Sequence, residues 1–265
     1  MKAIIAAAGY WTRMLPITKT VPKELLPVWN KPTIQYIVEW ISYWGINDII
    51  VVTSQWKQAL EDYFDKNYEL EEILEKKWKK SLLDEVNKPK QIANFCFLKQ
   101  RNQLGFAHAI LEAKNWIYDD FFLLTVGDTI FNKQIFKQIT ELHNQTKKSC
   151  ILLTEVPYDQ TQNYWVVKID NWKITDMVEK PTPENAPSNL VMWWMYILPK
   201  KIFEVIENTP INDEKQEILL PDSLKKLMET EEILPYITNS KIWDIWNPES
   251  WLKANIDLTN LNFDF

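Results

Sequence analysis

The sequence predicts an α/β fold, with a doubly wound, mainly parallel, Rossmann-like sheet that continues into a β-rich half. In the first half of the chain, short apolar runs alternate with segments of helical periodicity. Such βαβα order is typical of parallel sheets with helices on both faces. In the second half, β-branched and aromatic runs follow one another closely. The 265 residues contain no repeat or flexible linker, so we expect a single domain.

Four apolar runs of the first half are expected to be buried strands, each followed by a helix. The strands cover residues 3–8, 49–53, 94–98 and 121–126, and the helices cover residues 32–44, 55–64, 105–116 and 133–144. Ligands of such sheets bind outside the carboxyl ends of the strands. The residues that directly follow positions 8 and 126 are therefore the first candidates for a site.

Residues 65–86 interrupt this alternation with an amphipathic pattern that predicts one or two helices. The apolar positions at helical spacing are Leu70, Ile73, Leu74, Leu82 and Leu83. The segment is either a surface element that covers the core or a contact element for a second subunit. The sequence does not decide between the two.

The second half is expected to contain strands at residues 150–156, 165–170, 173–179 and 191–198. Helices are predicted at residues 199–208 and 216–230, followed by a strand at 233–238 and a last helix at about 248–261.

Composition excludes several classes of partner. The net charge is −6 and the pI about 5.2, which argues against nucleic-acid binding. No apolar run reaches the length of a membrane span, so no membrane association is expected. Cys96 and Cys150 lie inside apolar runs, which is typical of buried thiols in a reducing compartment. The cytoplasm is the expected location.

The balance of glycine and tryptophan is abnormal. The chain has 4 Gly and 14 Trp, whereas an average protein of this size has about 18 Gly, at ~7% of residues. Trp172 follows Asn171 in the gap between two predicted strands, where Asn-Gly is the preferred hairpin turn. Trp11 stands in a turn after the first strand, where close approach to a phosphate would favour glycine.

We therefore hypothesise that one codon, a reassigned stop codon, is read as glycine in the source organism. The alternative is that tryptophan is genuine and several turns are strained. The suspected positions are Trp11, Trp56, Trp78, Trp165, Trp172, Trp194 and Trp246. Trp116, Trp243 and Trp251 fit ordinary packing, and Trp29, Trp40, Trp44 and Trp193 are undecided.

Cations close to the first strand are candidates for holding a polyphosphate. Gly9 ends the strand, Thr12 and Arg13 follow in the turn, and Lys23 lies in the sequence PKELLP. Backbone donors, a planar guanidinium and a flexible ammonium together suit a triphosphate. A solvated loop with surface cations is the equally simple alternative, because the pattern is neither a Walker A loop nor a dinucleotide fingerprint.

Acidic residues follow three predicted strands. Asp128 comes after FFLLTVG and Asp244 after KIW, where two carboxylates with substrate phosphates would suit Mg²⁺. Asp128 could equally be a turn or capping residue. Glu179 and Lys180 close the strand KITDMVE, where a carboxylate suits sugar hydroxyls and a lysine suits a phosphate.

Taken together, these segments resemble the sugar-phosphate nucleotidyltransferase family over nearly the whole chain and in the same order. The resemblance rests on AAGYWTRMLPITKTVPKELLPVWNKPTIQYIVE, FDKNYELEEILEKKWKKSLLDEV, QLGFAHAI, GDT, NYWVVKID, MVEKPTPENAPSNL and DIWNPESWL. The family has glycine at all seven suspected tryptophans. The resemblance implies the nucleotide-diphospho-sugar transferase fold, with a nucleotide-binding half at residues 1–148 and a sugar-binding half at residues 149–265.

The resemblance also implies a role for each candidate residue. Ala8, Gly9 and the backbone around Trp11 would line the nucleotide, and Gln100 and Gly105 would read the uracil. Arg13 and Lys23 would hold the triphosphate, Asp128 and Asp244 would hold Mg²⁺, and Lys180 would grip the sugar phosphate. Trp165, through its backbone, Glu179 and the strand around Met192 would hold the glucose.

The implied reaction is uridylyl transfer from UTP to glucose 1-phosphate, in a homo-oligomer that is a dimer or a tetramer. The insertion at residues 65–86 is typical of the branch of the family that uses UTP. Two alternatives remain: transfer of thymidylyl or another nucleotidyl group, and an inactive nucleotide-sugar-binding relative if Trp11 is genuine.

The codon hypothesis predicts glycine at positions 11, 172 and 246 in protein isolated from the source organism. Peptide mass spectrometry reads these positions directly. Trp116 and Trp243, which fit ordinary packing, are the controls and should be found as tryptophan. Tryptophan at positions 11, 172 and 246 would overturn the hypothesis.

Overall fold

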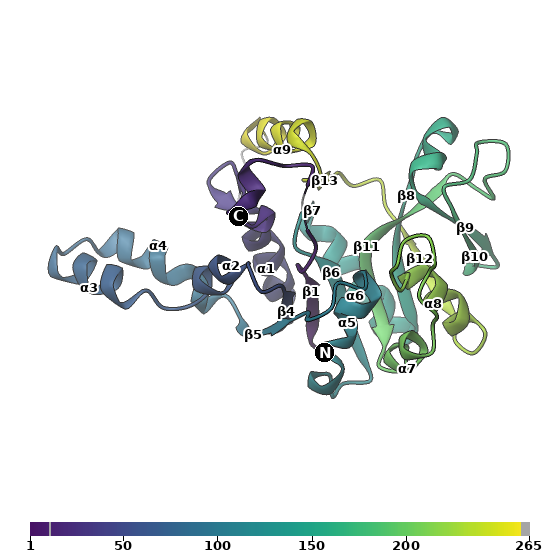
Figure 1. Ribbon diagram of the computed structural model, residues 1–265, viewed down its shortest axis with the longest axis horizontal. Coiled ribbons are helices and arrows are strands. Elements are labelled where there is room, and N and C mark those ends of the chain that lie inside the picture. The colour runs from purple at the N-terminus through teal and green to yellow at the C-terminus, as the bar shows by residue number, and fades with distance from the viewer. Residues whose placement is uncertain (11, 261–265) are drawn as a thin grey trace.

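A nine-stranded sheet runs through the centre of the protein (Figure 1). The computed structural model describes residues 1–10 and 12–260. The main path of the sheet has the strand order β10-β9-β11-β6-β1-β4-β5, and β8 pairs with β11 and β12 beside that path. This mixed α/β architecture confirms the predicted fold class.

The first half supplies the parallel strands, and all four expected strands form. They are β1 (Ala3–Ala6), β4 (Asp48–Thr53), β5 (Asn94–Lys99) and β6 (Phe121–Val126). β1 pairs in parallel with both β4 and β6, and β4 pairs in parallel with β5. The carboxyl ends of these strands therefore share one edge of the sheet.

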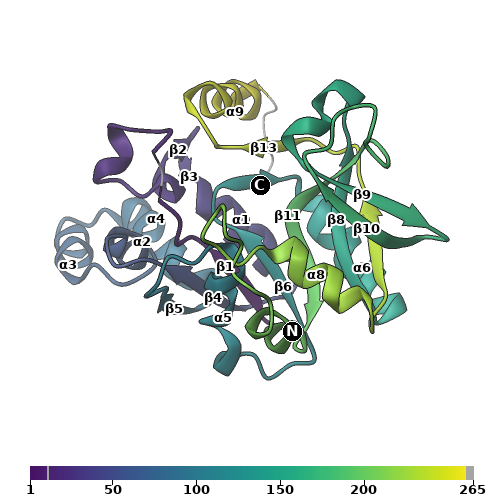
Figure 2. The same ribbon diagram turned by 45° about the vertical axis from the view of Figure 1, so that its right-hand side comes forward.

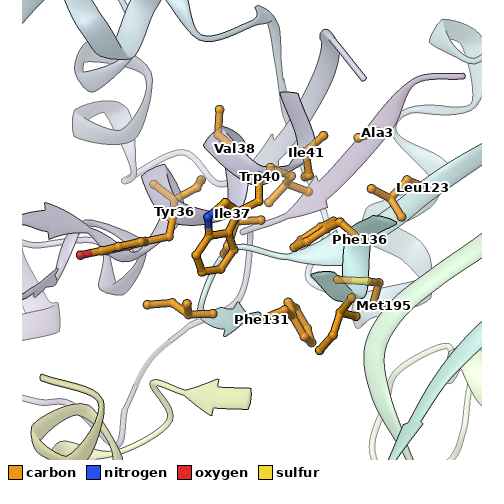
Figure 3. Packing of buried hydrophobic residues seen from close by; sticks show 14 of the residues in the cluster. Ala3, Tyr36, Ile37, Val38, Trp40, Ile41, Leu123, Phe131, Phe136 and Met195 are labelled. Atoms are coloured by element: carbon orange, nitrogen blue, oxygen red, sulfur yellow. The ribbon is translucent and has the colours of Figure 1, made fainter. Parts of the chain in front are cut away.

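Helices cover both faces of this sheet, because successive side chains of a strand point to opposite faces. One core contains Ile5 of β1 with residues of α1 (Thr33–Tyr43) and α6 (Lys133–Thr146). Figure 3 shows this packing around Ile37, Trp40 and Phe136. The other core contains Ile4 of β1, with residues of α5 (Phe106–Leu111), α7 (Ile202–Glu207) and α8 (Leu220–Met228).

The β-rich second half joins the same sheet mainly through antiparallel pairs. Its strands are β8 (Ser149–Glu155), β9 (Trp165–Asp170), β10 (Lys173–Glu179), β11 (Leu190–Pro199) and β12 (Ile233–Ile237). β11 pairs with β6, and so connects the two halves. The helix expected to begin at Gln216 begins at Leu220 instead, because Gln216 has φ +54° and its neighbour Glu217 bridges to Asn212.

The insertion forms two helices, α3 (Tyr68–Lys76) and α4 (Lys80–Gln91). Together with α2 (Gln58–Tyr63) they extend away from the sheet, on the side opposite to β9 and β10 (Figures 1 and 2). Leu74 is buried, whereas Leu70, Ile73 and Leu82 remain 39–48% exposed. An exposed apolar edge is compatible with a subunit contact, and that interpretation stays a prediction.

No helix in the described part of the chain is both long and apolar enough to cross a membrane. Cys150 is buried as expected, whereas Cys96 is only partly buried.

Among the tryptophans that the structure describes, three have the left-handed backbone conformation that favours glycine. The φ angles are +55° at Trp29, +54° at Trp78 and +64° at Trp172, and the three side chains are 47%, 93% and 70% exposed. Asn171 has φ +46°, so the two-residue turn between β9 and β10 has positive φ at both positions, as expected. The structure thus supports the glycine hypothesis at Trp78 and Trp172 and adds Trp29 to the suspected positions.

We expect Trp172→Gly to raise the free energy of unfolding by about 1–2 kcal/mol, because it relieves a non-glycine residue in the left-handed region. Urea denaturation measures this change. Trp116→Gly is the matched control, since Trp116 is also exposed, at 46%, but has no positive φ. The control should lose about 0.5–1 kcal/mol. Loss of stability in both variants would contradict the argument from backbone strain.

Candidate active site

The loops that follow β1 and β6 bring a lysine and an aspartate together. Lys23 lies in a short 3₁₀ helix, Lys23–Leu25, and Asp128 follows Gly127 at the end of β6. Lys23 Nζ donates to Asp128 Oδ2, and the two side chains are only 7% and 13% exposed. Burial lowers the pKa of Lys23, although the Asp128 and Glu24 carboxylates oppose this shift. Lys23, which was expected to hold the triphosphate, thus contacts Asp128, which was expected to bind the metal.

A second acid reaches this position through a two-stranded pair, of which the sequence predicted the short run before Asp244 but not its partner. β7 (Thr129–Phe131) pairs with β13 (Ile242–Asp244), and the register places Asp244 opposite Thr129. The Ile245 amide also donates to the Asp128 carbonyl at 3.0 Å. Strands of three residues are too short to show a period, so the pairing itself left no signal in the sequence.

The two carboxylates are close enough to disturb each other. The pKa of Asp244 is raised to about 7, first by burial and then by the charge of Asp128, while Lys23 and Arg13 act in the opposite direction. Such a pair favours a bound cation, because a divalent ion relieves the repulsion. Among the described residues no cluster of three or more acidic, His or Cys side chains could hold a metal ion. Two carboxylates with substrate phosphate oxygens are nevertheless a donor set typical of Mg²⁺.

Arg13 is held by one of the suspected tryptophans. Its guanidinium lies 3.8 Å from the centre of the Trp246 ring, in a cation–π contact. Trp246 lies between β13 and α9 (Pro248–Asn260), where its amide donates to Ser250 Oγ at 3.1 Å. The Trp246 ring thus contacts a residue that was expected to hold the triphosphate. Trp11 lies outside the described residues.

The residues expected to read the base lie together beyond β5. Gln100 is 5% exposed, and its backbone amide donates to the Thr53 carbonyl at 2.8 Å. Its Nε2 donates to the Gly105 carbonyl at 3.1 Å and lies 3.2 Å from His108 Nδ1. Gly105 has φ +91°, and a Cβ there would lie 2.7 Å from Glu217 Cβ, so only glycine fits. Ala8 is buried and Gly9 exposed at the end of β1.

The expected sugar-side residues gather where β9 begins and β10 ends. Trp165 pairs with Glu179 in the antiparallel register. Lys180 follows with φ +43°, and its amide donates to the Tyr164 carbonyl at 2.9 Å. Glu179 accepts from Lys215, and this ion pair occupies the carboxylate expected to bind sugar hydroxyls. Met192 is 9% exposed, at the start of an irregularity in the pairing of β11 with β8.

Tyr164 connects the sugar-side group to the acids and was not identified as a site residue from the sequence. Burial raises the pKa of Tyr164, and the charge of Asp244 raises it further. Because its carbonyl accepts from the Lys180 amide, this tyrosine lies between Lys180 and the carboxylate pair. The structure therefore brings both groups of predicted residues to one region at the carboxyl ends of the parallel strands.

Comparison with known proteins identifies the family. The family model described as nucleotidyl transferase matches residues 2–260. The chain belongs to the nucleotidyl transferase family. This membership confirms the resemblance drawn from the sequence.

Relatives of this nucleotidyltransferase are similar over almost their whole length. A Methanocaldococcus jannaschii protein, provisionally named as a UTP–glucose-1-phosphate uridylyltransferase, is 41% identical over 97% of this chain and 92% of its own. A UTP–glucose-1-phosphate uridylyltransferase of Staphylococcus epidermidis is 38% identical over 97% of this chain and 91% of its own. A UTP-bound UGPase structure from Acinetobacter baumannii superposes with a TM-score of 0.90 and 30% identity, covering 100% of this chain and 99% of the other.

We expect Trp246→Gly to strengthen binding of inorganic pyrophosphate, because it frees the Arg13 guanidinium from the ring. A cation–π contact of about 0.5–1 kcal/mol corresponds to a roughly two- to fivefold lower Kd. Isothermal titration calorimetry measures the change. The control is the same substitution in an Arg13→Ala background, where the gain should vanish. An equal gain with and without Arg13 would show that the contact does not restrain the arginine.

Proposed function

We propose that this nucleotidyltransferase transfers a uridylyl group from UTP to glucose 1-phosphate and releases pyrophosphate. The observation that carries the proposal is the partly buried pair Asp128 and Asp244, with Lys23 and Arg13 acting on it, at the carboxyl ends of the strands. The names of the relatives supply the substrate pair. The expected product is UDP-glucose.

The reaction needs no covalent enzyme intermediate. A phosphate oxygen of glucose 1-phosphate attacks the α-phosphorus of UTP in line, the bond to the bridging oxygen breaks, and pyrophosphate leaves. The attacking phosphate is already anionic, so no base is required. The contribution of the protein is to position two polyanions and to offset their repulsion.

Each group in the site has one task in this proposal. Lys23 and Arg13 contact the triphosphate and stabilise the charge on the departing pyrophosphate, while Lys180 contacts the phosphate of glucose 1-phosphate. Asp128 and Asp244 would hold Mg²⁺, which neutralises phosphate charge when bound. Because Lys23 is already paired with Asp128, it would have to leave that carboxylate to reach a phosphate.

The remaining candidates line the substrates. Gln100 and Gly105 face the uracil in this proposal, with the backbone of Ala8 and Gly9 along the nucleotide. Trp165, Glu179 and Met192 lie on the glucose side, and Glu179 must first release Lys215. We further propose a cytoplasmic homo-oligomer, with the exposed apolar edge of α3 and α4 as a subunit contact. The division into residues 1–148 and 149–265 follows the two substrates.

Two alternatives have specific support. The same site could use dTTP, since nothing in the described contacts of Gln100 requires uracil. An inactive binding protein is favoured by Trp246, whose ring holds the Arg13 guanidinium in a cation–π contact, and by Trp11 if it is genuine.

The test is pyrophosphate release with glucose 1-phosphate and each of UTP, dTTP, CTP and GTP, with and without EDTA. Two forms of the chain are compared: the one printed, and one with glycine at the seven positions suspected from the sequence and at Trp29. We expect release with UTP only, abolished by EDTA and faster in the glycine form. Preference for dTTP would identify the thymidylyl alternative, and no release in either form would sink the proposal.

Asp128→Ala and Lys180→Ala in the glycine form are the matched variants. Each should reduce kcat by at least roughly 100-fold, because the transition-state charge loses its metal ligand or its cation. Both should remain folded by circular dichroism. Lys114→Ala is the control, since Lys114 pairs with Glu207 in an exposed ion pair. Near-normal turnover in either variant would remove that residue from the mechanism.

A further inference from the structure

A buried ion pair lies directly behind the proposed triphosphate site, and the proposed reaction does not use it. Lys57 Nζ donates to Glu24 Oε1 at 2.8 Å and to the Ala7 carbonyl at 2.6 Å. The Lys57 side chain is 9% exposed and that of Glu24 is 0% exposed. A fully buried carboxylate cannot touch a substrate, so any role of the pair in the reaction is indirect.

The pair joins segments that each carry a site residue. Ala7 continues into Ala8 and Gly9, the loop expected along the nucleotide. Glu24 directly follows Lys23, which contacts Asp128. Lys57 itself directly precedes α2, and its amide donates to the Ser54 carbonyl at 3.1 Å. One ammonium group thus fixes the loop after β1 relative to the turn that carries Lys23.

The end of β6 is fitted to the same pair. A Cβ at Gly127 would lie 2.9 Å from Glu24 Cγ and 3.4 Å from Ala7 Cβ, so a larger residue would push the Glu24 side chain away. The Gly127 amide donates to the Ala6 carbonyl at 3.1 Å. The residue after Gly127 is Asp128. The position of Glu24 and the position of the metal acid are therefore coupled.

Stability alone does not explain this pair. Buried ion pairs of this kind can often be replaced by apolar residues without loss of stability, because both charges must be desolvated. Glu24 Oε2 is buried and makes no hydrogen bond to any residue that the structure describes, which adds to the cost. What an apolar pair could not supply is the directed bond from Lys57 to the Ala7 carbonyl.

We propose that Lys57 and Glu24 are positioning residues for nucleotidyl transfer. They hold the loop at residues 7–9 and the ammonium of Lys23 at a fixed spacing from Asp128, so that the triphosphate meets a preorganised set of charges. This inference rests on the proposed function. It assigns both residues an effect on turnover that exceeds their effect on folding.

The test compares Lys57→Met with the double variant Glu24→Gln/Lys57→Met in the glycine form. Lys57→Met leaves Glu24 as an unpaired buried charge and should lower Tm, while the double variant removes both charges and should recover most of that loss. We expect kcat to fall by roughly 100-fold in both variants, because a small displacement of the loop at residues 7–9 and of the Lys23 ammonium is enough to slow the reaction. The KM for glucose 1-phosphate should change by less than about twofold, since the sugar side is untouched.

Lys90→Met is the matched control. Lys90 pairs with Glu71 at 2.6 Å, with side chains 13% and 18% exposed, in the extended pair of helices α3 and α4. It should retain parental kcat. If the double variant regains both stability and turnover, the pair is structural only and the inference is overturned.

Hydrogen exchange distinguishes failure of this inference from failure of the proposed function. If the glycine form releases no pyrophosphate, the proposed function fails. Amide hydrogen exchange then tests on its own whether Lys57 and Glu24 hold the two segments in place. In Lys57→Met, amides in residues 3–9 and 22–28 should exchange faster together, while those in residues 68–91 stay unchanged. Unchanged exchange in the first two segments would overturn the inference.

Discussion

Repulsion between two partly buried carboxylates is the constraint on which the rest of the site depends. Asp128 and Asp244 come from segments more than a hundred residues apart, and the charge of Asp128 makes ionisation of Asp244 harder. The fold tolerates this because Lys23 lies against Asp128 and Arg13 acts on Asp244. Without substrate the protein supplies these counter-charges itself. When substrate binds, Lys23 and Arg13 are expected to contact its phosphates, so the two carboxylates need another cation to offset their charge. This exchange is the physical reason to expect a divalent metal here.

The sequence was sufficient for the parallel core but not for the assembly of the site. Buried runs such as residues 121–126 show their strand character locally, and the residue after each run is placed by the topology rule for parallel sheets. The approach of Asp244 depends on β7 and β13, which have three residues each and no measurable pattern. Its role beside Asp128 was expected from the acid itself, but the strand pairing that brings the two together was not. Tyr164, Glu24 and Lys57 were missed for a related reason: their roles exist only in contacts between distant segments.

Sharing one sheet between the two halves places the sugar side next to the nucleotide side. β11 pairs antiparallel with β6, so that Met195 lies opposite Thr125, three residues before Asp128. The same strand contacts β8 and β9, with an irregular register between Met192 and Tyr196. Antiparallel partners are chosen by long-range packing rather than by any local signal, and this explains why the sequence indicated a β-rich half but not its docking. Lys180, directly after β10, is thereby held on the sheet that also positions Asp128.

The tryptophans determine which form of this site is the working one. Backbone conformation and side-chain exposure are independent observations, and at Trp78 and Trp172 both indicate glycine. Trp40 and Trp243 are the counter-examples, since each is 4% exposed and packs in a core. These four positions therefore differ in physical environment, as expected if two different residues share one letter. If Trp246 belongs to the first kind, its contact with Arg13 does not exist in the native protein, and the guanidinium is available to the triphosphate. The activity of the site therefore depends on whether these positions are occupied by glycine or by tryptophan.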